Sequence, residues 1–308
     1  ATISSTKSKR RCNSFSPTRL TQPQNNHDVG TNNVTEIRYY EHNEWKCAYR
    51  YKPAECDNLI PLLLIHPVGI GMSSWFWNNL MHQYQGEVYA VDLIGCGTIG
   101  GDTWDPDAHG MFFPLTWVQQ CEILLRKVIC RPCAVVCQGA VAPVGVLLTW
   151  RDCQMQFAPE NTSATWSNQN FISHLILSSP PTYKAMIEPL PMSTLRRNYQ
   201  FYRSFLGGLA FDALENRFAI KLFSNLFLFD NPVDDNFITN AVTECKKELR
   251  SPIMAVNAGM LMHRSWKDEL ASISQPTLVL CGDTDPRRKG QRAYQEAMMH
   301  CTFKVMLE

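Results

Sequence analysis

Residues 134–150 read AVVCQGAVAPVGVLLTW, and this stretch decides the fold. The β-branched pair Val135-Val136 predicts a strand, Gln138-Gly139 predicts a sharp turn, and the small apolar residues that follow predict a helix. A strand, a tight turn and a helix in this order form the geometry that exposes a nucleophile in a very large class of enzymes. The tip of this turn is Gly139, however, and glycine has no side chain to act as a nucleophile.

Other short apolar runs predict more buried strands on both sides of this stretch. An N-terminal hairpin is expected over 36–40 and 45–51, and strands are expected over 59–65, 87–93, 133–137, 171–178, 276–281 and 302–307. Helices are predicted between them, over 73–84, 115–130, 141–151 and 292–300. Strands that alternate with helices at this spacing predict an α/β fold with a doubly wound, mostly parallel sheet.

Residues 184–262 have a different pattern, because they are helical in period, rich in Phe, Leu and Met, and lack a parallel-strand run. We interpret them as a helical cap over the carboxyl edge of the sheet. The core of the fold is then 31–183 together with 263–308, and residues 1–30 are a disordered tail. Apolar residues of such an insert more often pack on the sheet than meet a partner.

The charge distribution separates the tail from the body. The first 27 residues hold five of the 29 basic residues, no acidic residue and many Ser and Thr, but no apolar signal core. This composition predicts a plastid transit peptide, with a mitochondrial one or an ordinary disordered tail as alternatives. The rest of the chain is nearly neutral, so we expect no nucleic-acid partner. No apolar run reaches 18 residues, so we expect no transmembrane segment.

Four motifs in this order resemble the α/β-hydrolase superfamily over most of residues 36–308. They are LLLIHPVGIG at 62–71, VYAVDLIGCG at 88–97, RPCAVVCQGAV at 131–141 and PTLVLCGDTDP at 276–286. The first and third also resemble a hydrolase-like group of plants and cyanobacteria, in agreement with a plastid address.

The resemblance assigns the parts of a catalytic triad to positions in this chain. The nucleophile position falls on Gly139, so the triad is degenerate, and the acid position falls on Asp285, which also suits a plain turn residue before Pro286. The family's base follows the last strand, predicted here over 302–307, and His300 precedes that strand. The oxyanion-hole donors correspond to the N–H groups of Val68 and Ala140.

A register shifted by two residues makes Cys137 the nucleophile instead. Against this register, Val135 would stand where a small side chain is needed, and Pro143 would lie six residues past the nucleophile, where it disturbs a helix. In the Gly139 register Pro143 falls in the first helical turn, where proline is tolerated. Cys137 is therefore held as an alternative, and a buried core cysteine is the favoured interpretation.

These residues favour a non-catalytic or non-canonical ligand-binding or regulatory protein of the plastid, with a small apolar or carbonyl ligand. The alternatives are an active esterase-like hydrolase, through Cys137 or another mechanism, and a structural interaction subunit. The sequence Cys130-Arg-Pro-Cys133 precedes a strand instead of opening a helix, so a redox or metal role is disfavoured. We expect no cofactor and no metal.

Overall fold

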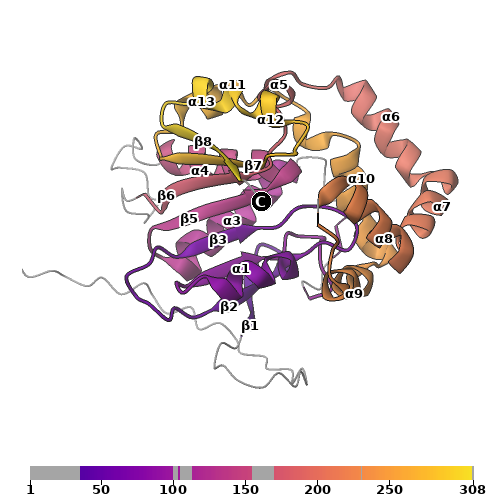
Figure 1. Cartoon of the computed structure of the whole chain (residues 1–308), viewed down its shortest axis with the longest axis horizontal. Helices are drawn as coiled ribbons and strands as arrows, with labels where there is room; N and C mark the ends of the chain where they lie inside the picture. The colour runs from indigo at the N-terminus through magenta and orange to yellow at the C-terminus, as the bar shows by residue number, and fades with distance from the viewer. Residues whose placement is uncertain (1–34, 100–102, 105–112, 155–169, 230, 307–308) are drawn as a thin grey trace, which may run out of the picture.

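The computed structural model describes residues 35–99, 103–104, 113–154, 170–229 and 231–306. The tail predicted over 1–30 lies outside these residues. Eight strands within them form one sheet (Figure 1). They are β1 (Glu36–His42), β2 (Trp45–Lys52), β3 (Leu62–Ile65), β4 (Val88–Val91), β5 (Cys133–Gln138), β6 (Ile172–Ser178), β7 (Thr277–Gly282) and β8 (Cys301–Met306).

The strand order is β1-β2-β4-β3-β5-β6-β7-β8. The pairs β1–β2 and β2–β4 are antiparallel, and every other pair is parallel. The predicted fold class, a doubly wound and mostly parallel sheet, is therefore confirmed. The four residues of β3 and the four of β4 are all buried, which is why these strands read as continuous apolar runs instead of alternating ones.

Helices cover both faces of the sheet. The helices of the core are α1 (Asn78–Gln83), α3 (Phe113–Ile123), α4 (Ala142–Gln154), α11 (Lys267–Ser272), α12 (Arg288–Gln291) and α13 (Ala293–Ala297). Shorter helical turns occupy Ser74–Trp77, Leu124–Ile129, Gly139–Val141, Lys247–Leu249, Met260–Met262 and Ser224–Leu228, of which Leu124–Ile129 and Ser224–Leu228 are π-helical. No helix in the described ranges combines the length and the apolarity needed to cross a lipid bilayer.

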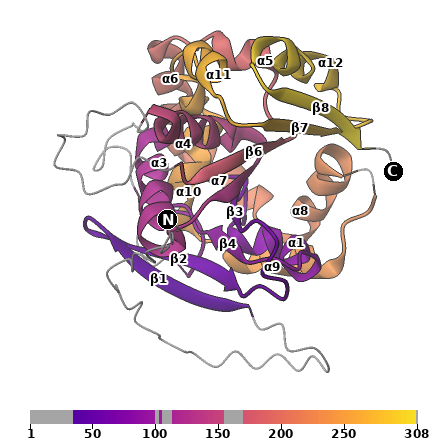
Figure 2. The same ribbon diagram turned by 90° about the vertical axis from the view of Figure 1, so that its left-hand side faces the viewer.

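Successive residues of the central strands pack on opposite faces. Leu63, Val135 and Cys137 belong to the large core, which includes residues of α3 and α4. Leu64 and Val136 belong to a second cluster with Met81 of α1. Alternate residues of each apolar run therefore face opposite sides of the sheet and pack against different layers of helices. Figure 2 shows these layers on either side of the strands.

The cap consists of the helices between β6 and α11. They are α5 (Tyr183–Ile187), α6 (Met192–Arg203), α7 (Phe205–Leu214), α8 (Arg217–Phe223), α9 (Asp235–Glu244) and α10 (Arg250–Asn257). Figure 1 shows α6 to α10 gathered on one side of the molecule, at the right. Two contacts join α9 to loops that follow parallel strands: the Thr98 N–H donates to Oε2 of Glu244 at 2.5 Å, and Gly71 lies against the backbone of Ala241. The cap therefore lies over the carboxyl edge of the sheet.

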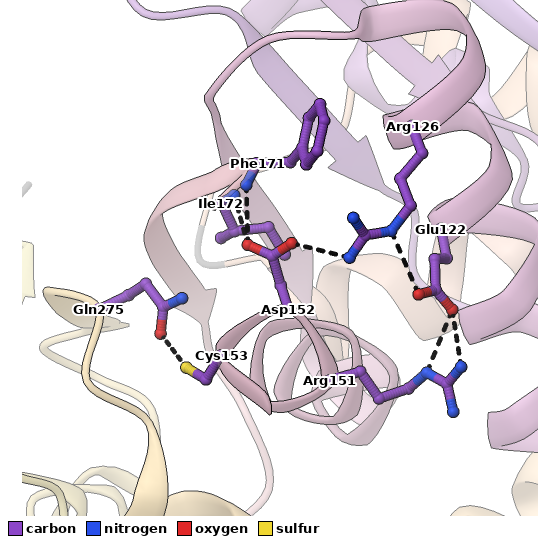
Figure 3. Close-up of polar contacts among 8 residues, drawn as sticks. All are labelled: Glu122, Arg126, Arg151, Asp152, Cys153, Phe171, Ile172 and Gln275. Atoms are coloured by element: carbon purple, nitrogen blue, oxygen red, sulfur yellow. Dashed lines mark hydrogen bonds and ion pairs between the residues drawn. The ribbon is translucent and has the colours of Figure 1, made fainter. Parts of the chain in front are cut away.

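A buried ion pair fastens the far end of α4 (Figure 3). Nη2 of Arg126 donates to Oδ1 of Asp152 at 3.1 Å, and both side chains are almost fully buried. Oδ2 of Asp152 accepts the backbone N–H groups of Phe171 and Ile172 at 2.9 and 2.8 Å. All these partners bond to the one carboxylate of Asp152 in α4. This carboxylate therefore connects α4 to the π-helical turn at Leu124–Ile129, which holds Arg126, and to the start of β6.

Most predicted element boundaries lie within a few residues of those observed, and the differences have local causes. The strand predicted from residue 59 begins at Leu62, because Pro61 cannot donate a ladder hydrogen bond. The helix predicted over 292–300 is shorter, α13 (Ala293–Ala297), and a separate helix, α12 (Arg288–Gln291), precedes it. Pro143 is the second residue of α4, where its missing N–H has no partner to lose.

Helix α4 approaches β5 at Gly145. A Cβ atom at this position would lie 2.3 Å from Sγ of Cys137 and 3.4 Å from Cδ1 of Leu175. No real Cβ contact is as short as the first of these, and both neighbours are buried side chains of the core. Only glycine therefore lets α4 pack this closely on the strand.

Replacing Gly145 with alanine should destabilise the fold, because the Cys137 side chain must move within a packed core. Overpacking of this kind costs ~1–3 kcal/mol, which exceeds the gain of up to ~1 kcal/mol in helix propensity. Urea unfolding followed by circular dichroism measures the change. Gly208→Ala is the matched control, since an added Cβ there meets nothing within 4 Å. The Cys137→Ala variant lacks the sulfur atom. If Gly145→Ala lowered the free energy of unfolding of this variant as much as that of the wild type, the proposed contact would be contradicted.

Candidate functional site

The turn between β5 and α4 has the backbone shape of a nucleophile elbow. Gly139 has φ +68°, in the left-handed region that favours glycine, and it directly follows Gln138, the last residue of β5. A Cβ added to Gly139 would meet nothing within 4 Å, so a side chain here would project into open space. The position therefore has the conformation and the free space of a nucleophile site but no reactive atom.

Cys137 lies two residues earlier, inside the core. Its side chain is 1% exposed and faces α4 at Gly145. Burial raises the pKa of the thiol well above its ordinary value, although a hydrogen bond with the Gly145 backbone opposes this. A nucleophilic cysteine needs a thiolate that the substrate can reach. Cys137 is buried, and its raised pKa keeps the side chain as a neutral thiol. The structure therefore favours the interpretation of Cys137 as a core residue.

The N–H groups of Val68 and Ala140 belong to neighbouring loops at the carboxyl edge. Ile65, the last residue of β3, pairs with Cys137 of β5, so the loops that follow these two strands start side by side. Within the residues that the structure describes, neither N–H group donates a hydrogen bond. Two unpaired donors next to the start of α4 favour an anion or a carbonyl oxygen.

The loop that carries Val68 is held by buried polar side chains. The Leu93 N–H donates to Nε2 of His66 at 3.2 Å, so Nδ1 carries the proton and donates to the Pro67 carbonyl at 2.8 Å. Oδ1 of Asp92 accepts the Ser74 N–H at 2.7 Å, at the far end of the same loop. His66 and Asp92 are therefore structural supports of the loop.

Asp285 lies in the turn after β7, where the family's acid is expected, but another side chain already occupies its carboxylate. Nε of Arg287 donates to Oδ1 at 3.0 Å and Nη2 donates to Oδ2 at 3.1 Å, with further bonds from the Arg287 N–H and from Gln291. Burial works against the ionised form of Asp285, and these hydrogen bonds outweigh it, so the pKa lies below its ordinary value. The bidentate arginine takes both oxygens that would otherwise orient a histidine.

Three histidines of the described ranges, His66, His263 and His300, make structural contacts. Both ring nitrogens of His66 have partners, as described above. The His300 carbonyl accepts the N–H of Thr277, the first residue of β7, so His300 lies at the amino edge of the sheet, away from Gly139. Nδ1 of His263 bonds to the Met260 carbonyl at 2.9 Å, and its ring packs against Trp266.

Metal and redox chemistry find no support among the described residues. None of their His, Cys, Asp and Glu side chains form a group of three or more able to hold a metal ion. Cys130 and Cys133 are both free thiols, and Sγ of Cys130 donates to the Arg126 carbonyl at 3.1 Å.

A sequence model of the alpha/beta hydrolase family matches residues 62–307, most of the chain. The chain belongs to the alpha/beta hydrolase family. Every motif on which the resemblance rested lies within the matched residues, and the expected superfamily is confirmed. No curated protein matches the sequence.

Solved structures of hydrolases share this fold. A serine hydrolase from Cycloclasticus zankles superposes with a TM-score of 0.61 at 16% identity, over 89% of this chain and 90% of that one. The 2-hydroxy-6-oxo-6-phenylhexa-2,4-dienoate hydrolase from Rhodococcus gives 0.63 at 16% identity, over 89% and 92%. A haloalkane dehalogenase from Agrobacterium tumefaciens gives 0.57 at 17% identity, over 88% of each chain. At these identities the likeness concerns the fold alone.

Sequence reasoning named Gly139, Asp285, Val68 and Ala140 as candidates but did not anticipate the pairing of Asp285 with Arg287. The signal was present, because an arginine two residues after an aspartate in a tight turn can fold back on its carboxylate. Asp285, Pro286 and Arg287 have this spacing. The pairing itself depends on the backbone of the turn, which the residue types do not specify.

The buried imidazole of His66 should make stability depend on pH. Burial is the main cause that lowers the pKa of His66 to about 4, from 6.5 when exposed. The unfolded chain therefore binds the proton first as the pH falls, so stability is full above pH 6.5 and is lost toward pH 4. The loss amounts to about 3 kcal/mol.

Urea unfolding across this pH range, compared between the wild type and His66→Gln, measures the contribution. Glutamine stays uncharged and can accept the Leu93 N–H, so the variant should lose less stability on acidification. Identical pH slopes in the two proteins would show that His66 does not titrate as described.

Proposed function

We propose that this alpha/beta hydrolase fold serves as a non-catalytic ligand-binding or regulatory protein. The observation that carries the proposal is Gly139, whose φ of +68° and open surroundings keep the elbow while its missing side chain removes the nucleophile. Without an oxygen or a sulfur at this position no covalent acyl intermediate can form. The bidentate pairing of Asp285 with Arg287 supports the same conclusion, because it commits the acid to a partner other than histidine.

The proposed ligand is a small apolar molecule with a carbonyl or carboxylate group. The N–H groups of Val68 and Ala140 would bind its oxygen, while the cap would cover its apolar part. Support comes from the unpaired state of both N–H groups in the described residues and from the contacts of α9 with the loops after β3 and β4. A regulatory role follows if ligand binding changes the contacts between the cap and these loops.

The alternative of a thiol-based esterase lacks such support. Cys137 is buried against Gly145, and its thiol has a raised pKa. An esterase of this kind would require α4 to separate from β5, which the packing opposes. In the alternative of a structural interaction subunit, the outer side of the cap would be the surface that contacts the partner protein.

A serine-directed fluorophosphonate probe tests the absence of the nucleophile. We expect no labelling of the wild type, and none of Gly139→Ser, since the described residues offer a new serine no base. Gly139→Ser should still fold, at a cost of ~1–2 kcal/mol for a side chain in the left-handed region. Labelling of the wild type, removed by substitution of a single serine or cysteine, would refute the proposal.

Binding of octanoate, a simple apolar carboxylate, tests the ligand site. Isothermal titration calorimetry should detect binding to the wild type and to Gly139→Ser but not to Gly139→Leu. The two variants impose similar backbone strain, while only the leucine fills the space beside the N–H groups. Equal binding to all three proteins would locate the ligand elsewhere, and no binding to the wild type would exclude this ligand class.

The plastid address remains part of the proposal and is supported by the composition of the first 27 residues, which are basic, rich in Ser and Thr and free of acids. Residues 1–34 fused to a fluorescent protein should direct it into the plastids of leaf cells. A fusion in which the five basic residues are replaced by glutamine is the control and should stay outside. Entry of the first fusion into mitochondria would support the alternative address instead.

A further inference from the structure

The outer side of the cap exposes large apolar side chains from four consecutive elements. Phe205 is 79% exposed, Phe218 76% and Leu206 66%. We call the most exposed of these residues the cap apolar surface, and it comprises Phe201, Phe205, Leu206, Phe218, Leu226 and Leu228. They fall on α6, α7, α8 and the π-turn at Ser224–Leu228, each of which contacts the next in the chain. These six residues are exceptions to the expectation that the cap's apolar residues more often pack on the sheet.

The same helices also have an apolar side that is buried. Tyr199 of α6, Phe211 of α7 and Ile220 of α8 have almost no exposure. On α7, Phe205 and Leu209 lie four residues apart and are exposed together, so they share an outward face. Large apolar side chains exposed on adjoining elements are typical of a surface that contacts a membrane or another protein.

Basic side chains accompany the exposed apolar residues. Residues 192–223 contain five basic residues, all exposed, which are Arg196, Arg197, Arg203, Arg217 and Lys221. The two acidic residues of this segment, Asp212 and Glu215, bond to Arg250 of α10, and Asp212 also pairs with Lys247. Arg217 and Lys221 pair with Asp235 of α9, so the positive charge beside the exposed apolar residues rests mainly on Arg196 and Arg197 of α6.

A hollow of about 250 Å³ lies on α6 and combines both chemistries. It is lined by Arg197, Asn198, Phe201 and Tyr202. The guanidinium and the amide suit a phosphate group, and the two rings suit the hydrocarbon beside it.

We infer that the cap apolar surface docks on the surface of an anionic lipid bilayer. Phenylalanine and leucine enter the boundary of the acyl chains while arginine and lysine meet the negative head groups, as in interfacial helices. A second copy of the chain is the other candidate occupant, and the experiment below distinguishes the two. The inference stands whether or not the site at Gly139 binds a carbonyl.

Docking would also hold the carboxyl edge of the sheet near the lipid. Helix α9 adjoins α8 and contacts the loops after β3 and β4. The loop that carries Val68 is one of these two. A bilayer under the cap would therefore supply apolar molecules to the side of the protein where Gly139 lies.

Sedimentation with vesicles tests the inference on the full chain. We expect the protein to bind vesicles of phosphatidylcholine mixed with phosphatidylglycerol, and to bind those of phosphatidylcholine alone more weakly. Added salt should reduce only the first. Phe205→Gln combined with Phe218→Gln should weaken binding to anionic vesicles by about tenfold or more, since burial of one phenylalanine is worth about that factor. Arg196→Gln combined with Arg197→Gln should abolish the preference for the anionic lipid.

Met299→Gln is the matched control, because Met299 is exposed outside the cap. This variant should bind as the wild type does. Absence of vesicle binding by the wild type, or binding that the cap variants leave unchanged, would overturn the inference. A wild-type dimer in analytical ultracentrifugation that Phe205→Gln with Phe218→Gln converts to a monomer, without vesicle binding, would identify a second copy as the occupant.

Discussion

The contact on which the rest of this structure depends is the approach of α4 to β5 at Gly145. Because residue 145 has no side chain, the helix lies against Sγ of Cys137 and the turn before it is drawn tight. The turn then needs a residue with positive φ, and Gly139 adopts it with little strain. The buried pair Arg126–Asp152 fastens the other end of α4 to the start of β6. Both ends of the helix are thus fixed to strands, and these contacts set the geometry of the turn at Gly139.

Polar side chains at the carboxyl edge of the sheet make structural hydrogen bonds. His66 and Asp92 hold the loop after β3 through backbone N–H groups, which leaves neither of them available for proton transfer. Asp285 is satisfied by Arg287 within its own turn. These three side chains are therefore each paired with a neighbour. Such a site is suited to holding a ligand, because its remaining open donors are backbone N–H groups that do not titrate.

The parts of the fold that could be predicted from sequence are those governed by local composition. Continuous apolar runs such as 62–65 predict strands buried on both faces, and the position of Pro143 selects one register of the elbow over another. The pairing of Asp285 with Arg287 was missed because it depends on backbone angles in one turn. The exposure of Phe205 and Phe218 was missed for a different reason. An apolar residue on a helix has the same sequence signature whether its face meets the sheet or the solvent, and only the packing of the neighbouring helices distinguishes the two cases.

By itself, the sequence determined the α/β class and the order of the strands along the chain, and it placed Gly139, a residue without a side chain, directly after the strand that ends at Gln138. These properties follow from residue type and spacing, which act over a few residues. Only the tertiary structure decided that Cys137 is sealed behind Gly145, that Asp285 is already paired, and that the cap turns an apolar and basic side outward. These properties depend on which surfaces meet, and that is settled by packing between segments far apart in the chain.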